Sequence, residues 1–85
     1  MEIIKKCDKI FFEKILAGKK KFEVRLADFE IKERDVLILK EVVDGKETGR
    51  WLKKKAGFIL KTKNLPYYEK EEIDKYGYLI IGLED

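Results

Sequence analysis

The sequence has no histidine and a single cysteine, Cys7, and these two shortages exclude several kinds of chemistry. One cysteine cannot form an intramolecular disulfide. Without histidine, His-based metal sites and Ser/His or Cys/His catalytic pairs are ruled out. Any catalysis would therefore depend on Lys, Glu, Asp, Tyr or Arg side chains. We expect no metal ion and no cofactor, and we interpret Cys7 as a small buried hydrophobic residue.

Long hydrophobic runs are also missing. The longest apolar stretches, such as residues 36–39 and 78–81, are far too short to cross a bilayer, and the N-terminus lacks the pattern of a secretory signal. The chain has 85 residues, of which 45% are hydrophobic and 44% are charged, so it is long enough for one core and too short for two. We therefore predict a single globular domain over residues 1–85, in the cytoplasm and away from membranes. Many Lys, Glu and Ile residues beside few Met, Cys and Asn are typical of thermophile proteins.

Charge is abundant but unevenly distributed. The net charge is only +3, yet residues 46–63 carry seven Lys or Arg residues against Glu47 alone, a local excess of +6. Residues 69–85 carry a net charge of −4. A basic central segment fits a partner rich in phosphates, and it fits equally well a solvated surface of mixed charge.

Two patterns near the N-terminus indicate a helix followed by a strand. Residues 8–17 begin with an aspartate suited to the N-cap and repeat apolar residues at helical spacing, and Gly18 follows at the position where helices often end in a left-handed conformation. Residues 21–26 then alternate charged and apolar side chains, the period-2 pattern of a half-buried strand. We expect Phe22 and Val24 to lie in the core and the charged set to share the opposite face.

The middle of the chain indicates a hairpin. Residues 36–43 are rich in β-branched and apolar side chains and should form a central strand covered on both faces. The Asp-Gly dipeptide at 44–45 favours a type I′ turn, so residues 46–60 should return antiparallel. Gly49 and Gly57 mark expected bulges or bends in that returning strand.

After Pro66, which ends regular structure, residues 69–75 resemble a short acidic helix and residues 78–83 the last strand. No linker or internal repeat divides the chain, so we predict one α+β, barrel-like domain.

A motif of the form G-x-K-x-x-E-x-R lies between the predicted helix and strand, at Gly18, Lys20, Glu23 and Arg25. It resembles the signature of the ASCH domain, a family of the PUA-like superfamily. The resemblance extends to the helix before the motif, the strand after residues 34–35 and the closing strand, and it is nearest to a short, uncharacterised ASCH-like branch.

This resemblance implies a PUA-like mixed β-barrel of about five to six strands, with an N-terminal amphipathic helix and a short C-terminal helix. It also implies RNA or modified-nucleotide recognition in a cleft beside the motif strand. The sequence departs from the pattern in having Arg34-Asp35 where such proteins often have Gly-Asp, so the rim of a cleft can differ.

Three residues of the motif are the first candidates for binding a ligand. On an extended strand Glu23 and Arg25 share a face about 6–7 Å apart, and Lys20 at the preceding turn can reach the same cleft if the backbone bends there. A Lys and an Arg near one carboxylate suit a phosphate, a nucleobase edge or a carbonyl compound. The alternative is an exposed Glu23–Arg25 salt bridge, worth about 0–1 kcal/mol.

Trp51, Lys53 and Lys55 form a second candidate set because they alternate onto one face of the returning strand. A stacking surface beside phosphate-binding charges suits single-stranded nucleic acid, and Tyr67 could add to the stacking. The alternative is that the tryptophan only packs in the core or at its rim.

Three functions remain open. The first is an RNA- or nucleotide-binding module. The second is a small hydrolase, because some ASCH relatives act on acylated cytidine nucleosides or are linked to RNA cleavage. Here Lys20 and Glu23 would be the catalytic candidates, but Glu23 stands where the amidohydrolase pattern has its Thr nucleophile, which favours binding. The third is a protein-interaction domain, with a homodimer through an exposed edge strand as one form.

Overall fold

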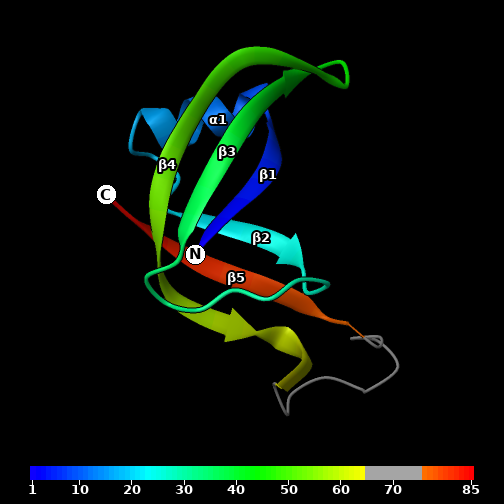
Figure 1. The fold of residues 1–85 in the computed structure, drawn as a ribbon, viewed down its shortest axis with the longest axis vertical. Coiled ribbons are helices and arrows are strands. Elements are labelled where there is room, and N and C mark those ends of the chain that lie inside the picture. The colour runs from blue at the N-terminus through cyan, green and yellow to red at the C-terminus, as the bar shows by residue number, and fades with distance from the viewer. Residues whose placement is uncertain (65–75) are drawn as a thin grey trace.

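A computed structural model describes residues 1–64 and 76–85, which form five strands, one α-helix and one 3-10 turn (Figure 1). In chain order the elements are β1 (Glu2–Asp8), α1 (Lys9–Leu16), β2 (Phe22–Leu26), β3 (Val36–Val43), β4 (Lys46–Lys61), the 3-10 turn η1 (Thr62–Asn64) and β5 (Tyr78–Glu84). The predicted acidic helix over 69–75, like Tyr67, lies outside the described residues.

The strands form one mixed sheet with the order β1-β3-β4-β5-β2, in which β1 pairs parallel to β3 and all other neighbours are antiparallel. β1, β3 and β4 run side by side, and β5 and β2 cross below them, so that the sheet curls into a half-barrel beside α1 (Figure 1). The predicted barrel-like α+β architecture is therefore confirmed at this level. β1 and β2 are the two end strands of this sheet.

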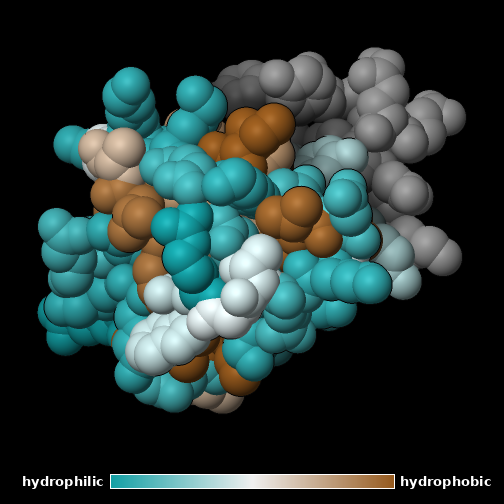
Figure 2. Space-filling model, turned by 90° about the horizontal axis from the view of Figure 1, so that it is seen from above, coloured by the Kyte–Doolittle hydropathy of each residue, from teal (hydrophilic) through white to brown (hydrophobic). Residues whose placement is uncertain are grey.

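The surface at the end where the β3–β4 hairpin turns is mostly hydrophilic, with separate hydrophobic patches (Figure 2). Within residues 1–64 and 76–85, no helix has the length and apolar character that a membrane span requires.

The β3–β4 hairpin follows the turn chemistry of the sequence. Asp44 and Gly45 have φ angles of 51° and 79°, as a type I′ turn requires, and Val43 pairs with Lys46 across it. Both predicted irregularities are present. The β3–β4 register shifts around Gly49, and the β4–β5 register shifts around Gly57, where β4 bends into the second half of the sheet.

β1 was not predicted from the sequence. Its inward row is Ile3, Lys5 and Cys7, and a lysine at the centre of that row hides the apolar alternation. The Lys5 ammonium lies 3.7 Å from the centroid of the Phe29 ring, a cation–π contact that makes the inward position tolerable. β1 also pairs in parallel with β3, a strand more than thirty residues away, and a local sequence pattern cannot predict such a partner.

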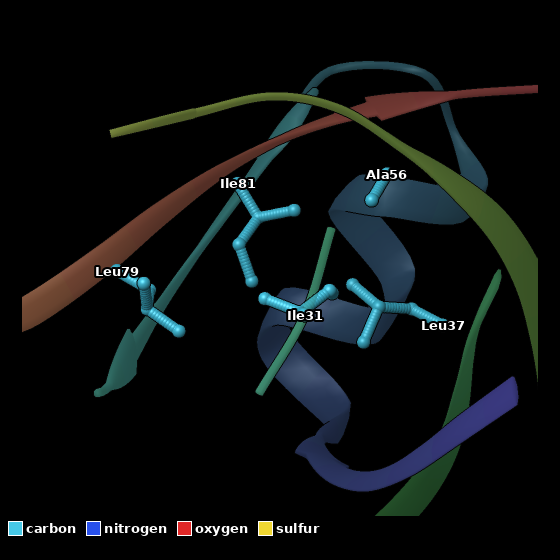
Figure 3. Close-up of a cluster of buried hydrophobic side chains, with 5 residues drawn as sticks. All are labelled: Ile31, Leu37, Ala56, Leu79 and Ile81. Carbon is cyan, nitrogen blue, oxygen red and sulfur yellow. The ribbon is translucent and has the colours of Figure 1, made fainter. Parts of the chain in front are cut away.

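Within residues 1–64 and 76–85, two clusters of buried side chains form the core. Figure 3 shows the first, in which side chains from the β2–β3 loop, β3, β4 and β5 point toward one another: Ile31, Leu37, Ala56, Leu79 and Ile81. The second joins α1 to the sheet through Cys7, Phe12, Ile15 and Leu39. Cys7 is buried as predicted, and this burial, reinforced by the nearby Glu23 carboxylate, raises the pKa of its thiol to about 11.

The faces of β2 are opposite to the prediction. Phe22 and Val24 are about half exposed, at 47% and 51%, whereas Glu23 between them is only 3% exposed. The alternation was correct but its direction was not, because the charged set finds ion-pair partners inside the half-barrel. On β3 the burial is uneven: Leu37 and Leu39 are buried, whereas Val36 and Ile38 on the other face are only partly buried.

Asp35 anchors the N-terminus of the chain. Its carboxylate accepts a hydrogen bond from the Met1 amino group at 3.2 Å and another from the Lys32 backbone at 2.9 Å. Arg34 beside it has a φ of 78°, the left-handed conformation that glycine adopts most easily. Arg34, which stands where similar proteins often have glycine, therefore adopts a strained backbone conformation.

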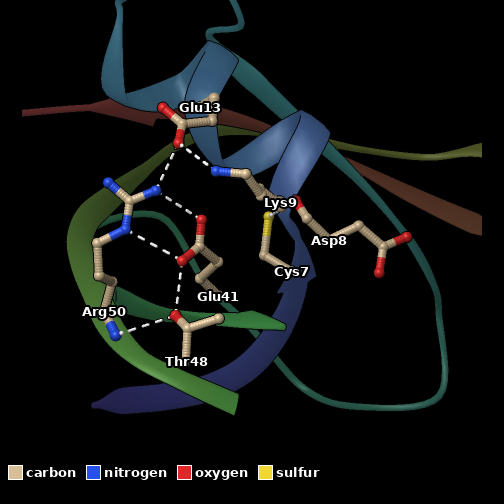
Figure 4. Close-up of polar contacts among 7 residues, drawn as sticks. All are labelled: Cys7, Asp8, Lys9, Glu13, Glu41, Thr48 and Arg50. Carbon is tan, nitrogen blue, oxygen red and sulfur yellow. Dashed lines mark hydrogen bonds and ion pairs between the residues drawn. The ribbon is translucent and has the colours of Figure 1, made fainter. Parts of the chain in front are cut away.

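A buried carboxylate on β3 ties α1 to the hairpin (Figure 4). Glu41 is 3% exposed and accepts hydrogen bonds from Arg50 at 2.6 and 3.0 Å and from the Thr48 hydroxyl at 2.6 Å. The Arg50 guanidinium also donates to Glu13 on the helix at 2.5 Å, so one side chain bridges two carboxylates from different elements. The hydrogen bonds from Arg50, and then from Thr48, lower the pKa of Glu41 from 4.5 to about 2.

Because the pKa of Glu41 is lower in the folded than in the unfolded chain, its contribution to stability is complete above about pH 4.5 and is lost as the pH falls toward 2. Glu41→Gln should lower the free energy of unfolding at neutral pH and reduce its fall across this window. Urea unfolding at several pH values measures both quantities. The exposed Glu30→Gln is the control, and a Glu41→Gln variant with the pH profile of the wild type would contradict the assignment.

Candidate functional site

The motif residues follow directly from the end of α1. Ala17 caps the helix, and Gly18 takes a φ of 76° at the next position, as predicted. The backbone amides of Lys19 and Lys20 both donate to the carbonyl of Lys14, which turns the chain back toward the sheet. This turn delivers the side chain of Lys20 to the inner face of β2.

Glu23 is the centre of the site. Its Oε1 accepts a hydrogen bond from Lys20 Nζ at 2.7 Å, and its Oε2 accepts one from Arg25 Nε at 2.8 Å. The Glu23 side chain is 4% exposed, that of Lys20 14% and that of Arg25 24%. The structure thus brings the three predicted residues together in a partly buried cluster, where charge pairing is much less screened than in an exposed salt bridge.

Arg25 also connects the two end strands of the sheet. Its Nη2 donates to the main-chain carbonyl of Lys6 on β1 at 2.6 Å. A side chain therefore spans the gap between β1 and β2, where backbone pairing would otherwise close a barrel. The gap is a cleft of about 500 Å³ between β1, α1 and β2, lined by Lys6, Cys7, Asp8, Phe11, Lys20, Phe22, Glu23, Val24 and Arg25.

Two aromatic rings that were not predicted as site residues flank this cleft. Phe11 and Phe22 are 48% and 47% exposed, and the Lys20 ammonium lies 5.6 and 4.9 Å from their ring centroids. A signal was present: Phe11 and Phe12 are adjacent in a helix, so they point about 100° apart and cannot both face the core. Phe12 is the buried one, at 1% exposed.

The cleft offers both cationic and main-chain hydrogen-bonding groups. Lys20 and Arg25 each have more N–H donors than the described contacts use. The Leu83 amide donates to the Lys21 carbonyl, so the odd-numbered residues along β2 exchange their backbone hydrogen bonds with β5. The N–H and C=O of Val24 therefore point to the opposite edge of β2, which faces the cleft. These groups can bind an anion and the edge of a planar ring side by side.

The second predicted set lies elsewhere. Trp51, Lys53 and Lys55 pair opposite Lys40, Ile38 and Val36 on the outer face of the sheet, and none of them lines the cleft. Trp51 is 57% exposed, which rules out the alternative of a core tryptophan.

Neither threonine of the sequence reaches the cleft. The Thr48 hydroxyl donates to Glu41, and Thr62 Oγ1 accepts from the Tyr78 amide. The part of the chain that the structure describes also has no cluster of acidic or cysteine side chains suited to a metal ion.

The burial of Glu23 between two cations predicts a large effect of its removal on the free energy of unfolding. Glu23→Gln leaves two partly buried cations without their counter-charge and should lower the free energy of unfolding by about 2–4 kcal/mol. The matched control is Glu2→Gln, which removes an exposed carboxylate paired with Lys53 at 3.3 Å and should cost less than about 1 kcal/mol. Chemical denaturation of both variants measures the difference, and equal costs would contradict a central role for Glu23.

Comparison with known proteins gives a family for this arrangement. A family model described as a domain of unknown function (DUF3850) matches residues 4–83. Among curated proteins none matches significantly. The chain is similar to the hypothetical protein PH0355, whose crystal structure matches with a TM-score of 0.69 and 27% identity, covering 99% of this chain and 98% of that one. The matched range contains Lys20, Glu23 and Arg25 together with the cleft around them, and the chain belongs to the DUF3850 family.

Proposed function

We propose that this chain is a PUA-like module of the ASCH type that binds RNA or a modified nucleotide in the cleft between β1, α1 and β2. The observation that carries the proposal is the convergence of Lys20, Glu23 and Arg25 on one cleft, with Phe11 and Phe22 exposed at its side. Cations beside aromatic surface are the usual elements of recognition of unpaired nucleotides.

The chemistry of each wall supports a nucleotide over a simple anion. A phosphate or a base carbonyl can accept hydrogen bonds from Lys20 and Arg25. A base can lie against Phe11 or Phe22, and the main-chain groups of Val24 offer a donor and an acceptor to its edge. Because Glu23 neutralises part of the charge, the cleft discriminates by hydrogen-bond geometry as well as by charge.

The same geometry favours binding over hydrolysis. Both carboxylate oxygens of Glu23 already accept hydrogen bonds from cations, so Glu23 positions Lys20 and Arg25. Neither Thr48 nor Thr62 is near enough to line the cleft as a nucleophile. Among the described residues that line the cleft, none supplies the activated hydroxyl that the hydrolase function would use.

Binding can be measured by titrating the protein with single-stranded RNA and with N4-acetylcytidine. Lys20→Ala and Arg25→Ala should each weaken RNA binding by about tenfold, because each removes a charge-assisted contact. RNA affinity should also fall as salt rises. Lys19→Ala is the matched control, because it removes an exposed, neighbouring lysine that does not line the cleft.

Circular dichroism of each variant separates loss of binding from loss of fold. If no RNA or nucleoside binds at low salt, or if Lys19→Ala weakens binding as much as Lys20→Ala, the proposed site is wrong. Conversion of N4-acetylcytidine to cytidine that Lys20→Ala abolishes would replace binding by hydrolysis as the function.

A further inference from the structure

The outer face of β1, β3 and β4 carries a basic and aromatic surface that is separate from the cleft. Register places Lys6, Lys40 and Trp51 in one row across these three strands. Lys53 and Lys55 continue from Trp51 along β4 on the same face. We call these five residues the outer basic face.

The described residues leave this face open. α1 packs on the opposite side of the sheet, where its buried residues Phe12 and Ile15 contact Cys7 and Leu39. Trp51 remains 57% exposed, and the side chain of Lys53 is 52% exposed. The indole of Trp51 therefore adds little to the core, and its exposed ring lies among lysines, where a planar ring of a ligand can stack on it.

Charge on this face is predominantly positive. Its four lysines meet two carboxylates: Glu2, 3.3 Å from Lys53, and Glu47, 3.7 Å from Lys40. Both ion pairs are exposed, so each is weak and a phosphate can compete for its lysine.

We propose that the outer basic face binds single-stranded nucleic acid, with one base stacked on the indole of Trp51 and the backbone held by the surrounding lysines. Lys53 and Lys55 follow Trp51 at steps of about 7 Å along β4, and Lys40 and Lys6 follow at steps of about 5 Å across the strands. The lysines therefore lie on two sides of the stacking ring, where they can contact phosphates on both sides of a stacked nucleotide.

Lys6 connects this face to the cleft. Its carbonyl accepts the hydrogen bond from Arg25 at the cleft, and its side chain begins the row that ends at Trp51. A strand with one nucleotide in the cleft can thus continue over the β1 edge. Binding at the outer basic face does not require the cleft, so the two sites can be tested independently.

Trp51 is the only tryptophan in the chain, so its intrinsic fluorescence reports on this face alone. Titration with an oligouridylate and an oligothymidylate, each of about 12 nucleotides, should quench the fluorescence. Comparing the affinities for the RNA and the DNA oligonucleotide shows whether the face distinguishes ribose from deoxyribose. By anisotropy of a labelled oligonucleotide, Trp51→Ala should weaken binding about 5- to 150-fold. The double variant Lys53→Ala/Lys55→Ala should reduce the slope of log affinity against log salt by about 1.4, because each contact to a single strand contributes about 0.7.

Two matched controls come from the same strand. Phe58→Ala removes an aromatic residue that is 70% exposed at the second bulge, and Lys61→Ala removes an exposed lysine beyond that bulge. Neither should change the affinity. Absence of quenching, or unchanged binding by folded Trp51→Ala and by the double lysine variant, overturns this inference. Loss of binding in Lys20→Ala with no effect of Trp51→Ala would leave only the cleft, whereas the reverse pattern would leave only the outer basic face.

Discussion

The buried carboxylate of Glu23 is the constraint on which the rest of the site depends. A carboxylate at this depth is tolerated only because Lys20 and Arg25 each donate to one of its oxygens. That requirement turns the charged face of β2 inward and leaves Phe22 beside the cleft. It also orients Arg25 toward the Lys6 carbonyl, so that one guanidinium holds the two end strands of the sheet at the distance of a cleft. The shape of the site and the burial of its charge therefore have the same cause.

Ion pairs support this small domain at other places as well. Two more buried carboxylates have cationic partners: Asp35 binds the Met1 amino group, and Glu41 binds Arg50 across the β3–β4 hairpin. Arg50 continues to Glu13 on α1, which fixes the helix against the β3–β4 hairpin. The same helix leads through Gly18 to Lys20, so these ion pairs lie next to the segment that delivers Lys20 to the cleft. The chain is short and its two apolar clusters are modest. Ion pairs of this kind therefore help to specify one arrangement of its helix and strands, whatever their net contribution to stability.

The two proposed surfaces divide nucleic-acid recognition between different kinds of group. The cleft combines fixed cations, main-chain groups and flanking rings, which suit one nucleotide held in a defined orientation. The outer basic face combines one exposed indole with flexible lysines, which suit a strand of any sequence. Lys6 belongs to both through different atoms. Membership of the DUF3850 family defines the chain by similarity, and the function of the two surfaces is proposed from their chemistry.

The sequence by itself determined the local elements. The helix with Gly18 at its end, the Asp44-Gly45 turn and the bulges at both glycines of β4 follow from backbone preferences that act over a few residues. It also identified Lys20, Glu23 and Arg25 by pattern. The tertiary structure decided what local patterns cannot: that β1 pairs parallel to β3, that Glu23 faces inward, and that Trp51 lies on a different surface from the cleft. Alternation shows that a strand has two faces, but which face is buried depends on partners that folding brings from elsewhere in the chain.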